Sequence, residues 1–70
     1  MIDLFQYEDC EIIKVIDIEN NEYIGRVSDV DGAEDQTDLF KQEQAITIFT
    51  EERGYVYFYQ SEIKSIEIIK

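Results

Sequence analysis

The densest group of potential ligands is the stretch SDVDGAEDQTD, Ser28 to Asp38, which holds five carboxylates around one glycine. Calcium takes six to eight oxygen ligands and tolerates flexible loops, so such a stretch could hold a hard cation. An EF-hand loop has glycine at position six, whereas here glycine comes at position four from the first aspartate. That register is wrong, so a solvated acidic loop is the favoured interpretation. The candidate metal ligands are Asp29, Asp31, Asp35 and Asp38.

The second conspicuous stretch is YVYFYQ, Tyr55 to Gln60. In a strand, its three tyrosines share one face, and Val56 and Phe58 share the other. Tyrosine stacks on bases in single-strand binders, but those proteins add a positive groove. It is also enriched in protein interfaces, where it gives large contact area at low entropic cost. Packing within a sheet, a protein interface and ligand stacking therefore all remain open for this face.

Catalytic chemistry has little support in the sequence. Cys10 is the single cysteine and stands between Asp9 and Glu11, whose charges disfavour a thiolate. The chain has no histidine, which excludes a cysteine-histidine nucleophile and the usual zinc sites. General acid catalysis by a carboxyl needs a pocket that a small barrel lacks. We expect no enzyme activity and no cofactor.

The charge balance restricts the partners. Seventeen Asp and Glu against six Lys and Arg give a net charge of -11, which repels nucleic acid and anionic membranes. Hydrophobic residues make up 44% of the chain, so we expect a folded domain over residues 1–70. No run approaches the roughly 20 apolar residues of a membrane span. No signal peptide is visible, and we expect a cytoplasmic protein.

Short stretches rich in β-branched and aromatic residues, with apolar residues at every second position, favour strands over helices. Turn residues separate them, because Asn20-Asn21 and Gly54 tolerate the positive φ angles of tight hairpins. Gly25 falls inside a strand, where a missing side chain permits a bend or a close approach of another backbone. The expected strands are Glu11–Ile18, Glu22–Val30, Ala45–Thr50, Tyr55–Gln60 and Ser65–Ile69.

Five short strands of this kind predict an all-β fold, a small, partly closed SH3-like barrel. An OB barrel is the alternative, but it usually needs a helix where only EERG is available. The segment Ile2 to Asp9 allows a short amphipathic helix, and Asp38 to Gln44 a helical turn. The expected core consists of Ile13, Val15, Ile24, Val27, Val30, Ile46, Ile48, Val56, Phe58, Ile63, Ile66 and Ile68.

The stretch KVIDIENNEYIGRVSDVD resembles the first motif of the Sm-like (LSm) family, with Gly25 and Asp31 at the glycine and aspartate of that motif. The stretch YVYFYQSEIKSIEII is similar to the second motif, with Ile63 at its apolar position. The resemblance covers Ile13 to Ile69. It implies an N-terminal helix on a strongly bent, five-stranded barrel. It also implies rings in which the fourth strand of one subunit pairs with the fifth of the next.

The departures from the family fall on the residues that bind RNA. Asp35 stands where the family has an asparagine, and Tyr59-Gln60 stands where it has arginine-glycine. The asparagine that reads a base and the arginine beside it are both missing, and the added charge has the wrong sign. The resemblance therefore implies the fold and the ring, and we expect no RNA or DNA binding.

Two functions remain open. The first is a non-enzymatic, homo-oligomeric scaffold that works through protein contacts; the second is an acidic antagonist or immunity-type protein that covers a basic surface of another protein. The first is favoured because YVYFYQ has no charge or proline and SIEII has only Glu67 to block edge pairing. The expected interface residues are Tyr55, Tyr57, Phe58, Tyr59, Ile66 and Ile68.

Overall fold

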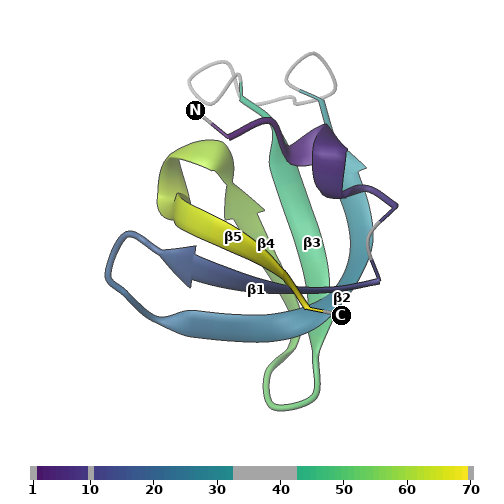
Figure 1. Ribbon diagram of the computed structural model, residues 1–70, viewed down its shortest axis with the longest axis vertical. Helices are drawn as coiled ribbons and strands as arrows, with labels where there is room; N and C mark the ends of the chain where they lie inside the picture. Colours follow the sequence, from purple (N-terminus) through teal and green to yellow (C-terminus); the bar gives the residue numbers. More distant parts are fainter. Residues whose placement is uncertain (1, 10, 33–42, 70) are drawn as a thin grey trace.

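The computed structural model describes residues 2–9, 11–32 and 43–69, and its architecture is all-β (Figure 1). Every expected strand is present, and the third has the expected bounds. The elements in chain order are η1 (Leu4–Tyr7), β1 (Ile12–Asp17), β2 (Glu22–Asp31), β3 (Ala45–Thr50), β4 (Gly54–Tyr59), η3 (Gln60–Glu62) and β5 (Ile63–Ile69).

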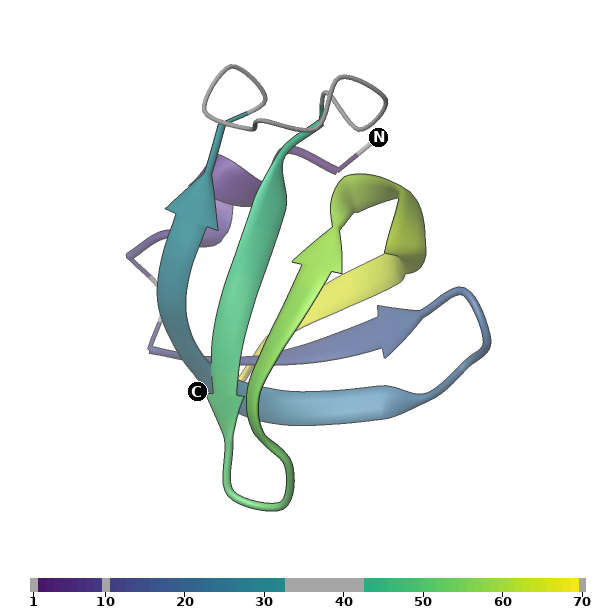
Figure 2. The ribbon, with the colours of Figure 1, turned by 180° about the vertical axis from the view of Figure 1, so that it is seen from behind.

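The five strands form one antiparallel sheet in the order β4-β3-β2-β1-β5. The long strand β2 curves strongly (Figure 2) and joins the two parts of the sheet. It pairs with β1 through Glu22 to Arg26 and with β3 through Arg26 to Asp31. The strands β4 and β5 therefore lie at the two edges of the sheet.

The hairpin turns use the residues expected from the sequence. Asn20 has φ 68° and Gly54 has φ 72°, both in the left-handed region. The Asp17 carboxylate fixes the first turn, because it accepts hydrogen bonds from the backbone N–H of Glu19 and of Asn21, each at 2.9 Å. The second turn is held by Thr50, whose Oγ1 accepts from the Arg53 N–H at 2.9 Å.

The core confirms most of the expected residues and corrects two of them. Ile24 is 56% exposed and Ile68 is 47% exposed. Ile24 pairs with Lys14 on the outer face, the face directed away from the core, because its neighbour Gly25 occupies the inner position. Ile68 does lie opposite the buried Ile13, but the edge strand β5 leaves it half-covered. The buried hydrophobic residues are Leu4, Ile13, Val15, Val30, Ala45, Ile46, Ile48, Phe58 and Ile63.

Three expected core residues, Val27, Val56 and Ile66, are partly buried and pack against this core. A register shift between Val27 and Asp29 allows both Val27 and Val30 to point inward. The shift inserts one residue and so reverses the alternation of the strand. The two fully buried residues absent from the expected set are Leu4 and Ala45.

The expected N-terminal helix is a single turn of 3-10 helix, η1. The Asp3 carboxylate caps it by accepting from the Phe5 N–H at 3.1 Å. Leu4 is completely buried, so this turn covers part of the core. Among the described residues, no helix is long and apolar enough to cross a membrane. Most of the expected helical turn at Asp38 to Gln44, and Cys10, lie outside those residues.

Gly25 permits the close approach of two strands that its position in the sequence suggested. A Cβ atom at Gly25 would collide with the carbonyl oxygen of Phe49 and lie 2.9 Å from the Phe49 carbonyl carbon. Any side chain there would force β2 and β3 apart at the point where β2 passes from one partner strand to the other. The curvature of the sheet therefore depends on a residue without a side chain.

Candidate functional site

The tyrosines of β4 lie on the outer face of the sheet, as expected from their alternation. Tyr55 is 71% exposed and Tyr57 is 45% exposed, whereas Phe58 on the inner face is 5% exposed. Tyr59 is half-buried. Of the expected interface residues, Phe58 therefore lies in the core, Ile66 is half-buried and Ile68 is exposed at the other edge.

The outer face of β2, β3 and β4 is organised in cross-strand rows. The first row carries Arg26, Phe49 and Tyr55, in which the rings of Phe49 and Tyr55 meet edge to face at 5.1 Å. The next carries Asp29, Thr47 and Tyr57. The third carries Asp31, Ala45 and Tyr59. In two of the three rows, a carboxylate on β2 thus lies on one side of this face and a tyrosine on β4 on the other.

The carboxylates act on the tyrosines through space. Partial burial raises the pKa of the Tyr57 hydroxyl above its usual value of 10.0. The neighbouring Tyr59 and the carboxylates of Asp31 and Asp29 raise the same pKa further, because they disfavour a second negative charge. The rings of Tyr57 and Tyr59 meet edge to face at 5.3 Å. This end of the face therefore combines aromatic surface with negative potential.

Two of the four expected metal ligands, Asp29 and Asp31, are described and lie in neighbouring rows of the outer face. Asp35 and Asp38 lie outside the described residues. Within residues 2–9, 11–32 and 43–69, no three acidic or cysteine side chains gather as metal ligands would. The described part of the acidic stretch thus contributes its carboxylates to the tyrosine face.

Gln60 stands at one of the positions where the chain departs from the RNA-binding pattern, and its side chain has a structural role. Its Oε1 accepts from the Gln44 N–H at 2.9 Å, and its Nε2 donates to the Ile2 carbonyl at 2.5 Å. The Gln44 Oε1 in turn accepts from the Leu4 N–H at 2.6 Å. This pair of glutamines fastens the N-terminal segment to the start of β3 and the end of β4.

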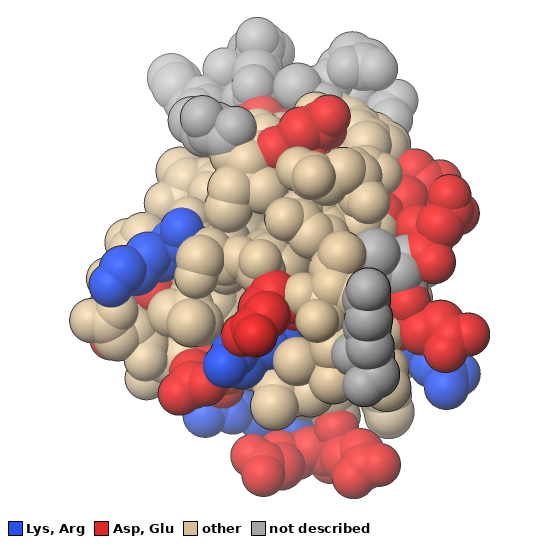
Figure 3. All heavy atoms as spheres, viewed as in Figure 1, with Lys and Arg blue, Asp and Glu red and all other residues tan. Residues whose placement is uncertain are grey.

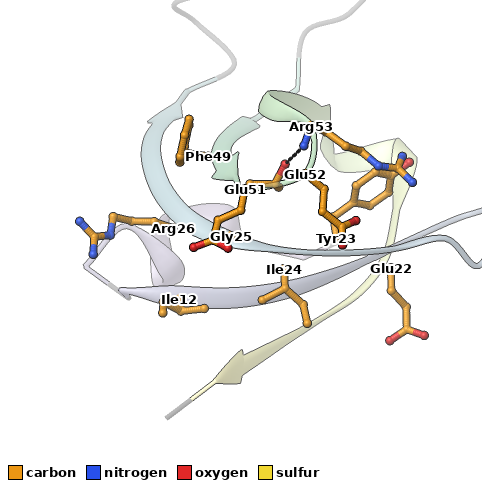
Figure 4. Close-up of a pocket in the computed structure, with 11 residues that line it drawn as sticks. Ile12, Glu22, Tyr23, Ile24, Gly25, Arg26, Phe49, Glu51, Glu52 and Arg53 are labelled. Atoms are coloured by element: carbon orange, nitrogen blue, oxygen red, sulfur yellow. Dashed lines mark hydrogen bonds between the residues drawn. The ribbon is translucent and has the colours of Figure 1, made fainter.

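A groove that the sequence did not reveal lies between the β1–β2 hairpin and the β3–β4 turn (Figure 4). It has a volume of about 680 Å³. Exposed Ile12, Ile24 and Phe49 line it together with charged residues. The sequence placed Ile24 in the core and therefore gave no sign of this groove. An inward Gly25 turns the neighbouring Ile24 outward, and that is the signal that could have revealed the groove. The charged lining residues are Glu22, Arg26, Glu51, Glu52 and Arg53.

Three of the described basic side chains have partners in the structure. Lys14 forms ion pairs with Glu67 at 3.2 Å and with Glu22 at 3.4 Å. Hydrogen bonds to Glu67 and Glu22 raise the pKa of Lys14. The Arg53 guanidinium lies 4.6 Å from the centre of the Tyr23 ring, and Lys64 donates to Asn20 Oδ1 at 2.7 Å. The excess acidic side chains are therefore only partly balanced within the chain.

Figure 3 shows how charge is arranged on one side of the molecule. Acidic side chains gather toward the right and lower margins of this view, and a few charged side chains also lie near its centre and top, among uncharged residues. Among the described residues, basic side chains interrupt the acidic ones on this side. Comparisons with models of protein families, with curated proteins and with solved structures found no match to this chain. Functional conclusions rest on the chain's own geometry.

Proposed function

We propose that this chain is a non-enzymatic, Sm-like small barrel that assembles with copies of itself into a protein-interaction scaffold. The observation that carries the proposal is the strand order, which leaves β4 and β5 at the two edges of the sheet. They correspond to the segments YVYFYQ and SIEII, in which Glu67 is the one charge and no proline blocks pairing; β5 also carries Lys64 near its start. They are also the strands that join subunits in the family the sequence resembles.

The backbone of β4 turns alternate peptide groups toward its open edge. The Gln60 N–H donates to the Gln44 carbonyl at 3.0 Å, on the β3 side, whereas the Tyr59 N–H turns away and donates to Glu62 Oε1 at 3.0 Å. Because peptide groups alternate in direction along a strand, those of Tyr55 and Tyr57 point the same way as that of Tyr59. Glu62 thus satisfies one end of the edge, and the groups at Tyr55 and Tyr57 face outward.

The open peptide groups of β5 follow from the direction of the peptide groups of its neighbour β1. The Asp17 N–H donates to the Asn21 carbonyl at 3.0 Å, toward β2, and the next N–H, of Ile18, donates to the Glu62 carbonyl at 3.1 Å. Even-numbered residues of β1 therefore face β5, where Lys14 pairs with Glu67 and Ile12 with Ile69. The intervening residues of β5, Ile66 and Ile68, direct their peptide groups to the open edge.

Antiparallel pairing between these edges brings exposed apolar side chains together. Residues that exchange hydrogen bonds across antiparallel strands lie opposite each other, with side chains on the same face. On β4 the outward peptide groups belong to outer-face residues, Tyr55 and Tyr57. On β5 they belong to the inner-face residue Ile68 and its neighbour Ile66. An antiparallel joint therefore places the tyrosine side chains of one copy beside the half-covered isoleucines of the next, on one face of the continuous sheet.

The joint is head to tail, so it closes into a ring or continues as an open filament, depending on the rotation between copies. The charge of -11 per chain opposes it. Salt screens this repulsion over about 8 Å at physiological ionic strength, so assembly strengthens as salt rises from low values. A filament would precipitate or scatter strongly, whereas a ring has a fixed mass.

The test is sedimentation equilibrium on a matched pair of variants, Ile68→Lys and Ile69→Lys. Both add the same charge at exposed positions of β5, 47% and 38% exposed in turn, but only Ile68 has its peptide group at the open edge. We expect the parent chain to have a mass several times 8.3 kDa. Ile68→Lys should lower the association constant at least about tenfold, and Ile69→Lys should change it little.

Thermal unfolding of both variants serves as the control, since each should melt close to the parent. A parent mass of 8.3 kDa at high concentration and moderate salt would refute self-assembly. Equal weakening by both substitutions would show that charge, rather than the edge of β5, controls association.

A further inference from the structure

We propose that the outer face of the sheet at the row of Asp29, Thr47 and Tyr57 binds an arginine side chain in a basic segment of another protein. This face is separate from the open peptide groups of β4, because side chains stand roughly perpendicular to the plane in which strands pair. The proposal therefore goes beyond self-assembly and does not depend on it.

The spacing of the rows suits a guanidinium group. Asp29 lies opposite Thr47, and Thr47 lies opposite Tyr57, so the carboxylate and the ring stand two strands apart. Two strand spacings are about 10 Å. The residue between them, Thr47, is short and half-buried. A guanidinium above Thr47 can stack on the Tyr57 ring while it meets the Asp29 carboxylate.

The two side chains on either side of Thr47, the Tyr57 ring and the Asp29 carboxylate, both favour a cation. A guanidinium stacks on aromatic faces and binds carboxylates through paired N–H groups. Asp29 is exposed and forms no ion pair with a described basic side chain, and the charge of Asp31 in the next row adds to the negative potential there. Burial is the main cause of the raised pKa of Tyr57, and the charges of Asp31 and Asp29 add to it at the same place. An anionic ligand would meet repulsion there, and a neutral ligand would form no ion pair with Asp29.

The occupant is a basic partner rather than a second copy of this chain. Each copy carries a charge of -11, so copies repel at a site that is itself acidic. The Arg53 guanidinium already stacks on Tyr23. Arg26 lies at the far end of the same outer face, in the row of Phe49 and Tyr55, so the cation belongs at the Asp29 and Asp31 end.

The test is isothermal titration calorimetry with an acetylated, amidated octapeptide of alternating arginine and glycine. Two matched peptides replace arginine by lysine or by neutral citrulline. We expect the arginine peptide to bind more tightly than the lysine peptide, because lysine cannot stack or pair in the same way. The citrulline peptide should show no measurable binding.

The variants Asp29→Asn and Tyr57→Leu should each weaken binding of the arginine peptide about threefold to fivefold, which is the range for an exposed cation–π or ion-pair contact. Their matched controls are Glu51→Gln, in the turn at the far end of β3, and Tyr55→Leu, in the row of Arg26. Both controls should bind within about twofold of the parent. All four positions are exposed, and circular dichroism verifies folding.

Repeating the titration in the Ile68→Lys background separates this site from assembly, because the peptide should bind to monomers with the same affinity. No heat with the arginine peptide at millimolar concentration would overturn the proposal. An equal loss of affinity for the arginine peptide in Glu51→Gln and Asp29→Asn would also overturn the proposal, since binding would then follow net charge alone. Equal binding of the citrulline peptide would exclude a cation site.

Discussion

The β3–β4 hairpin and the β1–β5 pair show two different relations between register and burial. In the hairpin, inner-face Ile46, Ile48 and Phe58 are buried, and outer-face Tyr55 and Tyr57 are exposed. In the β1–β5 pair, Ile13 and Ile68 lie opposite each other, yet the first is fully buried and the second is 47% exposed. Alternation assigns a side chain to a face; whether that face is covered depends on the neighbouring elements. At the β5 edge the cover is incomplete.

A carboxylate at an inner-face position in each region should have the largest effect and tests whether the two regions differ. Phe58→Asp buries a charge without a partner and removes a packed ring. It should therefore unfold the domain or lower its free energy of unfolding by more than about 4 kcal/mol. Val56→Asp should act in the same direction, because Val56 packs against the core. Chemical denaturation followed by circular dichroism measures both.

Ile68→Asp is the matched substitution at the β5 edge, and Tyr57→Ser is the matched substitution on the outer face of β4. Each should lower the free energy of unfolding by less than about 1.5 kcal/mol, because solvent already reaches these side chains. If Ile68→Asp unfolded the chain as Phe58→Asp does, inner-face position alone would control stability. Equal destabilisation by Tyr57→Ser would contradict the assignment of the two faces of β4.

The bend at Gly25 joins the two regions, and a second prediction tests it. Gly25→Ala should lower the free energy of unfolding by about 1–3 kcal/mol, because the added Cβ meets the backbone of Phe49. Gly54→Ala should cost about 1–2 kcal/mol for a different reason, since no atom lies within 4 Å but φ is 72°. An asparagine at each position separates contact with Phe49 from backbone conformation as the cause. Asparagine tolerates the left-handed region, but its Cβ needs as much space as that of alanine.

Gly54→Asn should therefore be milder than Gly54→Ala, and Gly25→Asn should be at least as destabilising as Gly25→Ala. Thermal and denaturant unfolding of the four variants measure this. If Asn restored stability at Gly25 as well, backbone conformation rather than contact with Phe49 would explain that glycine.

The sequence predicted the parts of the fold that depend on local pattern. The strand at Ala45–Thr50, the turns at Asn20 and Gly54, the two faces of β4 and the close approach at Gly25 are all confirmed. Each follows from residue type or from alternation within one segment. That β4 and β5 lie at the edges was also foreseen, from their lack of charge and from the family resemblance.

The sequence did not predict features that depend on how segments meet. Ile24 was placed in the core because it is apolar in a strand, but Gly25 takes the inner position beside it. The groove that exposed Ile24 helps to line was missed for the same reason. Leu4 is fully buried, and the side chains of Gln44 and Gln60, distant in sequence, bond to the backbone of Leu4 and of Ile2. No local pattern contains that information.

A smaller effect concerns the turn between β1 and β2. Partial desolvation acts to raise the pKa of Asp17, but hydrogen bonds from Asn21 and Glu19 outweigh it and lower the pKa below 3.8. A carboxyl whose pKa is lower in the folded state stabilises above the unfolded value, and this stability is lost as pH falls through the folded value. Asp17→Asn should therefore melt below the parent at pH 6, with a smaller difference at pH 3.

Glu19→Gln is the control for this prediction, because it removes an exposed carboxylate from the same turn but leaves the hydrogen bonds to Asp17 intact. Its melting temperature should follow the parent at both pH values. A melting difference between Asp17→Asn and the parent that stayed constant from pH 6 to pH 3 would show that the ionised carboxylate does not hold the turn.

Amide hydrogen exchange by NMR tests most directly whether β4 and β5 pair between copies. The N–H groups of Tyr57 and Ile68 face the open edges, whereas even-numbered residues of β4 and odd-numbered residues of β5, such as Phe58 and Glu67, face β3 and β1. At high protein concentration, protection at Tyr57 and Ile68 should approach that at Phe58 and Glu67, and it should disappear on dilution or in Ile68→Lys. Fast exchange at Tyr57 and Ile68 while Phe58 and Glu67 stay protected, at every concentration, would contradict assembly through these edges.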